Sequence, residues 1–206
     1  MFAVTEVVRT AISPDVRLRT RRSLDERLFV RWPRIYVAFA RAFFLLPPRS
    51  RLRRALLRRQ LLSGWSAWSR GDLNLMLVRY APDYQSVFAP EFVTVGLSSS
   101  YRGHAGVREW TADLSEAWEQ MELTLHEIVD AGDRLVNLGR FRSRGSGSGV
   151  ELDSPTGQAL WVEGGLVARE RVFFDWDEAL AAAGLPRDAL AHLGLSPEAG
   201  AAAAPD

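Results

Sequence analysis

The sequence predicts an α+β fold in which helices come first and a curved antiparallel sheet then wraps around them. Two observations lead to this prediction. Apolar residues recur at helical spacing in the first part of the 206-residue chain, up to Met121, and at a spacing of two after it. The segments of period two are joined by short turns that contain Gly, which is typical of an antiparallel meander. Such a curved sheet encloses a cavity at its concave face.

The N-terminal region predicts two helices after a leader, residues 1–22, that shows no sustained period. Ser23 and Glu26 have the spacing of a capping box, so a first helix should begin there and end near Pro33. A second helix should run to Leu46, because two prolines follow that residue.

The next segment predicts a long helix, capped by Ser50, and a short helix that ends at Pro82. The long helix has an apolar face made of Leu57, Leu61, Trp65 and Trp68. A strand over residues 84–95 should break at Pro90. The clearest helix of the chain then starts at Gly103 and shows one continuous apolar face.

Four strands and a last helix complete the predicted domain. The strands are expected at residues 122–129, 134–144, 150–162 and 166–174, and the helix at residues 177–183. We therefore divide the chain into a basic helical N-terminal extension (residues 1–50), a barrel domain (residues 51–186) and a flexible Ala-rich tail (residues 187–206).

The composition excludes several classes of chemistry. The chain has no Cys and no Lys, so disulfides, thiolate metal sites, Schiff bases and a Walker A phosphate loop are excluded. A chain without Cys fits a reducing compartment, and we expect a cytoplasmic protein. Residues 35–46 are apolar but contain Arg41, and they are shorter than the roughly 20 residues that span a bilayer.

Positive charge is concentrated in residues 1–59, which we call the basic segment. It contains 15 Arg and four acidic residues, a balance of +11, and because the whole chain carries +1, the remainder carries −10. Two interpretations are open. The basic segment packs over the acidic remainder, which we favour, or residues 23–46, where aromatic residues alternate with arginines, contact an anionic membrane. We expect no nucleic-acid partner, since no recognition motif accompanies the charge.

Three segments, in this order after the helices and first strand, resemble a known family: YRGHAGVREW, DAGDRLVNLGRFRSRGSGSGV and GQALWVEGGLVARERVFFD. They are similar to the SnoaL-like (polyketide-cyclase-like) branch of the nuclear transport factor 2 (NTF2)-like superfamily, over about residues 55–185. The resemblance implies an NTF2-like cone-shaped barrel whose open end admits a small apolar molecule, and often a homodimer formed through the sheet. It implies no single reaction, because this fold carries isomerases, cyclases, epoxide hydrolases and proteins without catalysis.

The last predicted strand places one carboxylate on an apolar face. Side chains alternate along the strand, so Glu170 shares a face with Val172, whereas Arg169 and Arg171 lie on the other face. A carboxyl group in a poorly hydrated cavity has a raised pKa, which is the profile of a general acid or base. The alternative is a structural ion pair between Glu170 and an arginine at the rim of the cavity.

The hairpin before this strand decides which residue faces Glu170. A three-residue loop over residues 163–165 would pair Gln158 with Glu170, and a two-residue turn at Gly164 and Gly165 would pair it with Arg171. We favour the first register, because it matches the apolar residues Leu160 and Val162 with Ala168 on the next strand.

The resemblance also bears on catalysis. Limonene epoxide hydrolases, which are similar in fold, carry an aspartate two residues after the position of Glu170, where this chain has Val172. Their Arg-x-Asp pair aligns with Arg140 and Arg142, so the arginine is kept and the aspartate is lost. Glu170 could therefore act as a catalytic acid or base, with Arg140 as its electrostatic partner, only in a reaction whose geometry differs from that of the epoxide hydrolases.

The remaining candidates have weaker support. Tyr84 and Trp110 are expected to line the pocket together with Gln158 and Val172, although ordinary core positions would also explain the two aromatic residues. The three dispersed histidines have no metal-ligand spacing, so we expect no metal and no cofactor.

Three functions follow from these observations. The first is a SnoaL-like protein that binds a small apolar molecule without an assigned activity, and it is the one we favour. The second is an isomerase, cyclase or hydrolase that uses Glu170 as acid or base without a cofactor. The third is a peripheral membrane or interaction module formed by residues 23–46.

Overall fold

The computed structural model describes residues 7–12, 18–94, 96–146 and 149–185. The α+β fold predicted from the sequence is confirmed. The elements in chain order are β1 (Val8–Ala11), α1 (Leu24–Arg31), α2 (Pro33–Phe44), α3 (Arg51–Ser69), α4 (Leu73–Leu77), β2 (Tyr80–Phe88), α5 (Pro90–Thr94), β3 (Ser100–Arg102), α6 (Gly103–Ala117), β4 (Trp118–Asp130), β5 (Arg134–Gly145), β6 (Glu151–Glu163), β7 (Leu166–Phe173) and α7 (Trp176–Ala182).

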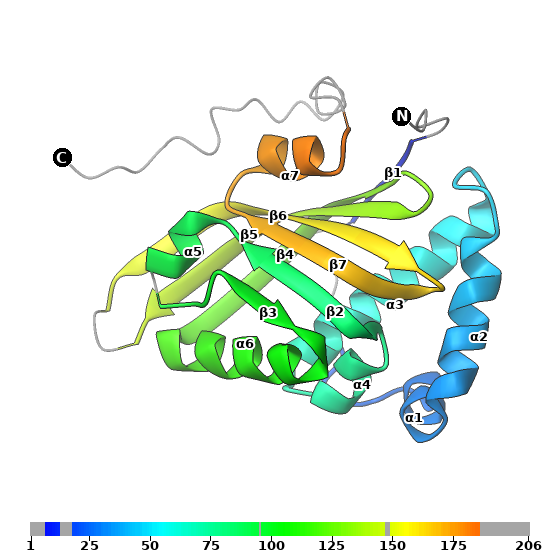
Figure 1. Ribbon diagram of the computed structural model, residues 1–206, viewed down its shortest axis with the longest axis horizontal. Helices are drawn as coiled ribbons and strands as arrows, with labels where there is room; N and C mark the ends of the chain where they lie inside the picture. The colour runs from blue at the N-terminus through cyan, green and yellow to red at the C-terminus, as the bar shows by residue number, and fades with distance from the viewer. Residues whose placement is uncertain (1–6, 13–17, 95, 147–148, 186–206) are drawn as a thin grey trace.

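The strands form one curved sheet in the order β1-β4-β5-β6-β7-β2-β3. All neighbours are antiparallel except β2 and β7, which are parallel. Helices α3, α4 and α6 lie against one face of the sheet, α7 covers part of the other, and α2 stands at one end beside the β6–β7 turn (Figure 1). The sheet and its helices thus form a half-open barrel.

Helices α1 and α3 begin where the sequence predicts them, whereas α4 ends at Leu77 rather than at Pro82, and α5 lies where the sequence predicts a strand. Glu26 accepts a hydrogen bond from the Ser23 backbone N–H at 3.0 Å, which is one half of the capping box that starts α1. The Ser50 hydroxyl caps α3 by accepting from the Arg53 N–H at 3.3 Å. The prediction of an irregular leader is wrong for β1, which pairs with the edge of β4. The predicted tail, residues 187–206, lies outside the described residues.

The β6–β7 hairpin differs from the register that we favoured. Gly164 and Gly165 both have positive φ (59° and 85°) and form a two-residue turn. A bulge follows, because Trp161 pairs with Arg169 and Val162 with Val167, which leaves Ala168 without a partner. The bulge moves the register by one residue, so Gln158 lies opposite Val172 and Leu160 lies opposite Glu170. Gln158 and Glu170 therefore still share a face.

Helix α2 of the N-terminal extension packs against this turn. The Arg41 Nε donates to the Gly164 carbonyl oxygen at 3.0 Å. Gly165 is so close to α2 that a Cβ atom at this position would lie 2.7 Å from the Arg41 backbone nitrogen. The turn thus needs glycine at Gly165 for its positive φ and for the approach of the helix.

We predict that Gly165→Ala detaches α2 from the barrel and lowers the free energy of unfolding by about 2–3 kcal/mol, from backbone strain and steric overlap together. Gly71→Ala is the matched control, because Gly71 also has a positive φ, of 65°, but no atom lies within 4 Å of the place that an added Cβ would take. Urea denaturation of both variants separates the two effects. Equal losses in the two variants would show that the contact with α2 contributes nothing.

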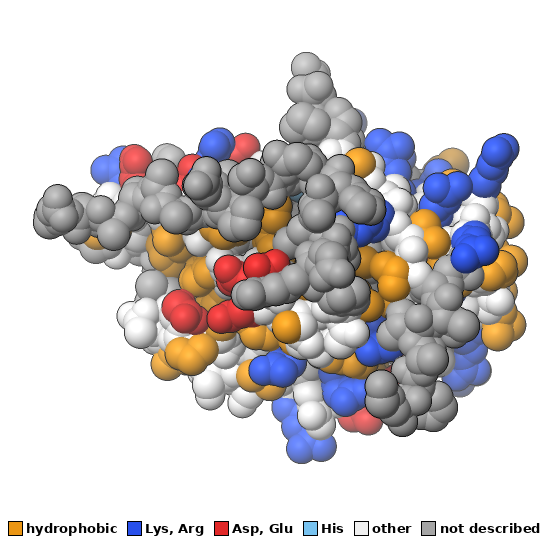
Figure 2. Space-filling view, turned by 90° about the horizontal axis from the view of Figure 1, so that it is seen from above, with side chains coloured by type: hydrophobic (Ala, Val, Ile, Leu, Met, Phe, Trp, Pro, Cys, Tyr) orange, Lys and Arg blue, Asp and Glu red, His pale blue; other side chains and the backbone are white. Residues whose placement is uncertain are grey.

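Ion pairs join the basic segment to the remainder of the chain. Arg53 binds Asp130 with both partners buried, and Arg22 reaches Asp72 at 2.5 Å. In Figure 2, arginine side chains gather at the end of the molecule that carries α2 and α3, and acidic side chains lie mainly toward the other end. The charge asymmetry of the sequence is thus visible on this face of the molecule, and ion pairs with the remainder of the chain neutralise part of it.

Two negative findings concern only the described parts of the chain. No helix there combines the length and the apolar character required to cross a membrane. Within the same ranges, no group of three or more His, Asp or Glu side chains could hold a metal ion.

Candidate functional site

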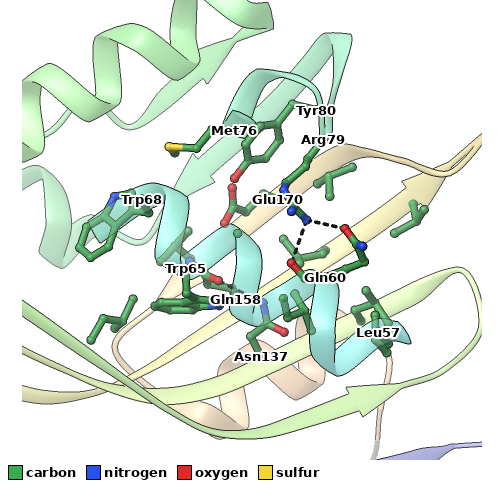
Figure 3. A pocket seen from close by; sticks show the side chains of 18 of the residues that line it. Leu57, Gln60, Trp65, Trp68, Met76, Arg79, Tyr80, Asn137, Gln158 and Glu170 are labelled. Carbon is green, nitrogen blue, oxygen red and sulfur yellow. Dashed lines mark hydrogen bonds between the residues drawn. The ribbon is translucent and has the colours of Figure 1, made fainter. Parts of the chain in front are cut away.

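A cavity of about 170 Å³ lies between the concave face of the sheet and helices α2, α3 and α4. Its wall is mainly aromatic and aliphatic. The aromatic residues come from α2 (Tyr36, Phe43, Phe44), α3 (Trp65, Trp68), α5 (Phe92), α6 (Trp110) and strands β2 and β5 (Tyr80, Phe88, Phe141). The polar lining residues are Gln60, Arg79, Asn137, Thr156, Gln158 and Glu170, several of which are drawn in Figure 3. The site is therefore an apolar chamber with a few separated polar groups.

Glu170 projects from β7 into this chamber and is 5% exposed. The Tyr84 hydroxyl, on the neighbouring strand β2, donates a hydrogen bond to Glu170 Oε2. Burial raises the pKa of Glu170 to about 7, although the hydrogen bond from Tyr84 acts in the opposite direction. The carboxyl group can therefore exchange a proton near neutral pH, as a general acid or base must.

Two tyrosines surround this carboxyl group. The rings of Tyr80 and Tyr84 are 4.4 Å apart, and the Tyr80 hydroxyl points toward Glu170 (Figure 3). Burial, and secondly the negative charge of Glu170, raise the pKa of both phenols well above the usual value. Both hydroxyls thus remain hydrogen-bond donors at neutral pH. They can stabilise an anion, either the Glu170 carboxylate itself or charge that develops on a bound molecule.

A second polar group lies on the floor of the cavity. Asn137 Nδ2 donates to Gln158 Oε1 at 3.3 Å across strands β5 and β6. Asn137 is 3% exposed, and its Oδ1 has no hydrogen-bond partner. Trp110 Nε1, in another part of the lining, is likewise buried without an acceptor. Buried polar atoms without a partner are costly, so these two are suited to a molecule that supplies one donor and one acceptor.

The structure brings together most of the residues predicted from the sequence. Glu170, Gln158, Val172 and Trp110 all line the cavity. Tyr84 is fully buried behind the wall and acts through its bond to Glu170 rather than as a lining residue.

The placement of Arg140 in the site is wrong. Its Nε donates to Asp153 on the outer face of the sheet, where Arg142 also contacts Asp153 at 3.1 Å. Alternation along β5 turns Phe141 into the cavity, and the arginines on either side of it must then face outward. Arg140 therefore cannot be the electrostatic partner of Glu170.

Three further lining residues, Arg79, Tyr80 and Asn137, are not predicted from the sequence. Asn137 had a detectable signal, because it is an amide within the apolar run LVNL of a predicted strand. Arg79 and Tyr80 stand at the junction of α4 and β2. Helical spacing assigns Tyr80 to the apolar face of a short helix that ends at Pro82, whereas Tyr80 is the first residue of β2.

Comparison with known proteins identifies the family. The family model of the SnoaL-like domain matches residues 62–170, which is more than half of the chain. The chain belongs to the SnoaL-like domain family. Solved structures of NTF2-like proteins share the fold of this chain. No curated protein sequence matches the chain.

Similar solved structures share the fold of this SnoaL-like protein. TerC, co-crystallised with polyporic acid, is 24% identical with a TM-score of 0.51, and the match covers 62% of this chain and 95% of TerC. An NTF2-like protein of unknown function from Burkholderia pseudomallei is 22% identical with a TM-score of 0.53, covering 60% of this chain and 94% of its own. An NTF2-like protein from Burkholderia thailandensis is 22% identical with a TM-score of 0.51, covering 62% and 96%.

The SnoaL-like domain begins inside α3, so α1 and α2 lie outside the matched region. Tyr36, Phe43 and Phe44 of α2 nevertheless contribute to the wall of the cavity. The N-terminal extension of this protein thus supplies part of the candidate site.

Proposed function

We propose that this SnoaL-like protein binds a small, largely apolar molecule in the cavity between the sheet and helices α2 to α4. The observation that carries the proposal is the aromatic chamber in which Asn137 Oδ1 and Trp110 Nε1 have no partner. A chamber of this kind gains free energy by exchanging water for apolar groups, and its few polar atoms orient the bound molecule.

The test is a binding titration with the neutral fluorescent probe N-phenyl-1-naphthylamine. We expect saturable binding to the intact chain, and at least a tenfold weaker affinity for Val172→Phe, because the larger ring fills the chamber. Val87→Phe is the matched control, since Val87 lies on the neighbouring strand and is 44% exposed. No binding to the wild-type protein, or an equal effect of both substitutions, would contradict the proposal.

We propose as the second candidate an enzyme on the same fold, with Glu170 as general acid or base. The observation in its favour is the buried carboxyl group, with a pKa of about 7, that faces the chamber and accepts a hydrogen bond from Tyr84. Molecules that co-purify with the protein can be released and identified by native mass spectrometry. Conversion of such a molecule by the wild-type protein but not by Glu170→Gln would support this candidate, and equal conversion would exclude Glu170.

Membrane contact through residues 23–46 and a homodimer stay predictions. The buried apolar residues of that segment, such as Phe29 and Phe43, pack inside the fold, so membrane contact would depend on exposed ones such as Trp32 and Ile35. A homodimer formed through the sheet would have to accommodate α7, which packs on the outer face of β6 (Figure 1).

A further inference from the structure

Arg79 places a permanent positive charge in the wall of the chamber. Its side chain passes along Gly64 of α3, where an added Cβ atom would lie 3.9 Å from Arg79 Nη1. On its other side, the guanidinium carbon lies 5.6 Å from the centre of the Tyr36 ring of α2. Arg79 therefore stands at the seam between the N-terminal extension and the barrel, and it faces the same chamber as Glu170 (Figure 3).

The hydrogen-bond partners of Arg79 are neutral. Nη1 donates to the backbone oxygen of Gln60 at 2.8 Å and to its Oε1 at 3.1 Å, and Nη2 donates to Ser63 Oγ at 2.8 Å. Nε is buried and has no partner. Among the described residues, no Asp or Glu forms an ion pair with this guanidinium, that is, none has a carboxylate oxygen within 4.0 Å of its nitrogen atoms.

Two other arginines of this protein that are buried or nearly so have carboxylate partners. Arg53 binds Asp130, and Arg70 binds Glu26 at 3.0 Å. Glu170, whose carboxyl group also lines the chamber, is hydrogen-bonded to Tyr84 and not to Arg79. A cation in an apolar wall is costly unless an anion compensates it, and here the described residues supply none in direct contact.

We infer that Arg79 marks a subsite for the anionic group of the ligand, and that the ligand is a small organic acid, a carboxylate or enolate with an aromatic or alicyclic body. The inference rests on the proposed function and adds the chemical class of the bound molecule. The unpartnered Nε and the second hydrogen of Nη2 offer donors to an oxyanion, and charge-assisted hydrogen bonds of this kind are stronger than neutral ones. The aromatic wall would then surround the body of the acid.

The test compares naphthalene-2-carboxylate with naphthalene-2-carboxamide, which share one shape and differ in charge. At pH 6 the free acid is ionised, while most Glu170 is protonated because its pKa is about 7. Isothermal titration calorimetry should show the carboxylate binding at least tenfold more tightly than the carboxamide. Arg79→Gln should remove this preference by weakening carboxylate binding, with carboxamide affinity unchanged within about twofold. Retained carboxamide binding also shows that the variant is folded.

Two further variants test whether the preference depends on the positive charge at this position. Arg79→Lys keeps the charge and should retain a preference for the carboxylate, and Arg171→Gln, on the exposed face of β7, should match the wild-type protein. Equal affinity of the wild-type protein for both compounds, or no binding of either, would overturn the inference. The proposed function would fail separately, through the absence of binding by the neutral probe N-phenyl-1-naphthylamine.

Discussion

Asp130→Asn should lower the free energy of unfolding by about 3–5 kcal/mol, the range found when one partner of a buried ion pair is removed. Arg53 Nε and Nη2 donate to the two carboxylate oxygens of Asp130, each at 2.7 Å, and both side chains are 2% exposed. The amide of Asn cannot balance the guanidinium charge, which would then stay buried without an anion. Urea denaturation of the wild-type protein and the variant measures the loss.

The same arginine also holds the N-terminal extension in place. Its Nη1 donates to the carbonyl oxygens of Phe44, the last residue of α2, and of Leu46 just after it, at 2.9 and 2.8 Å. Its Nη2 donates to the carbonyl oxygen of Gly132 in the β4–β5 turn at 2.5 Å. Helix α2, helix α3 and the sheet therefore meet at Arg53, and weakening this point should loosen the α2 wall of the chamber.

An exposed pair provides the control for this prediction. Asp25 contacts Arg59 at 2.8 Å, with side chains 28% and 51% exposed, so Asp25→Asn should cost no more than about 1 kcal/mol through that pair. The double variant Arg53→Met/Asp130→Leu should be more stable than Asp130→Asn alone, because it removes both buried charges. A loss no larger for Asp130→Asn than for Asp25→Asn would contradict our account of the pair.

Local periodicity was sufficient to predict most of the fold. The strands β4 to β7 were predicted within a few residues because alternation is a property of each segment by itself. The short edge strands β1 and β3 were missed, since three or four residues carry no period. Their strand conformation comes from pairing with β4 and β2, which the local sequence does not report.

The candidate site was predictable only where a side chain lies on a regular strand. Glu170 was placed correctly by alternation, but its pairing depended on a bulge at Ala168 that no local pattern specifies. Arg140 was misplaced because the alignment with epoxide hydrolases was followed instead of the inward position of Phe141 in the same strand. The position of Arg79 is set by its packing against α2 and α3, and tertiary packing of this kind cannot be predicted from the local sequence.

Glu170 should make this protein less stable as the pH rises toward neutrality. The pKa of its carboxyl group is about 7 in the folded protein, against a reference of 4.5. Between these values the folded state binds more protons than the unfolded state, so the contribution is fully present below about pH 4.5 and is lost as the pH rises through 7. The shift corresponds to a loss on the order of 3 kcal/mol above pH 7.

The quantity to measure is the difference between the wild-type protein and Glu170→Gln, because other groups also titrate. Burial raises the pKa of Glu127 as well, so some loss of stability with pH persists in the variant. Urea denaturation at pH 5 and pH 8 should show a clearly larger loss for the wild-type protein, since Gln cannot ionise but still accepts a hydrogen bond from Tyr84. The same pH dependence in both proteins would show that the carboxyl group titrates normally.

Tyr84→Phe gives an independent test of the cause of the shift. The Tyr84 hydroxyl stabilises the carboxylate form, so its removal should move the pKa of Glu170 further upward. The loss of stability should then extend to a higher pH than in the wild-type protein, and the double variant Tyr84→Phe/Glu170→Gln should lose this extension. If the stability of Tyr84→Phe is instead lost at a lower pH than that of the wild-type protein, the hydroxyl does not stabilise the carboxylate as the geometry indicates.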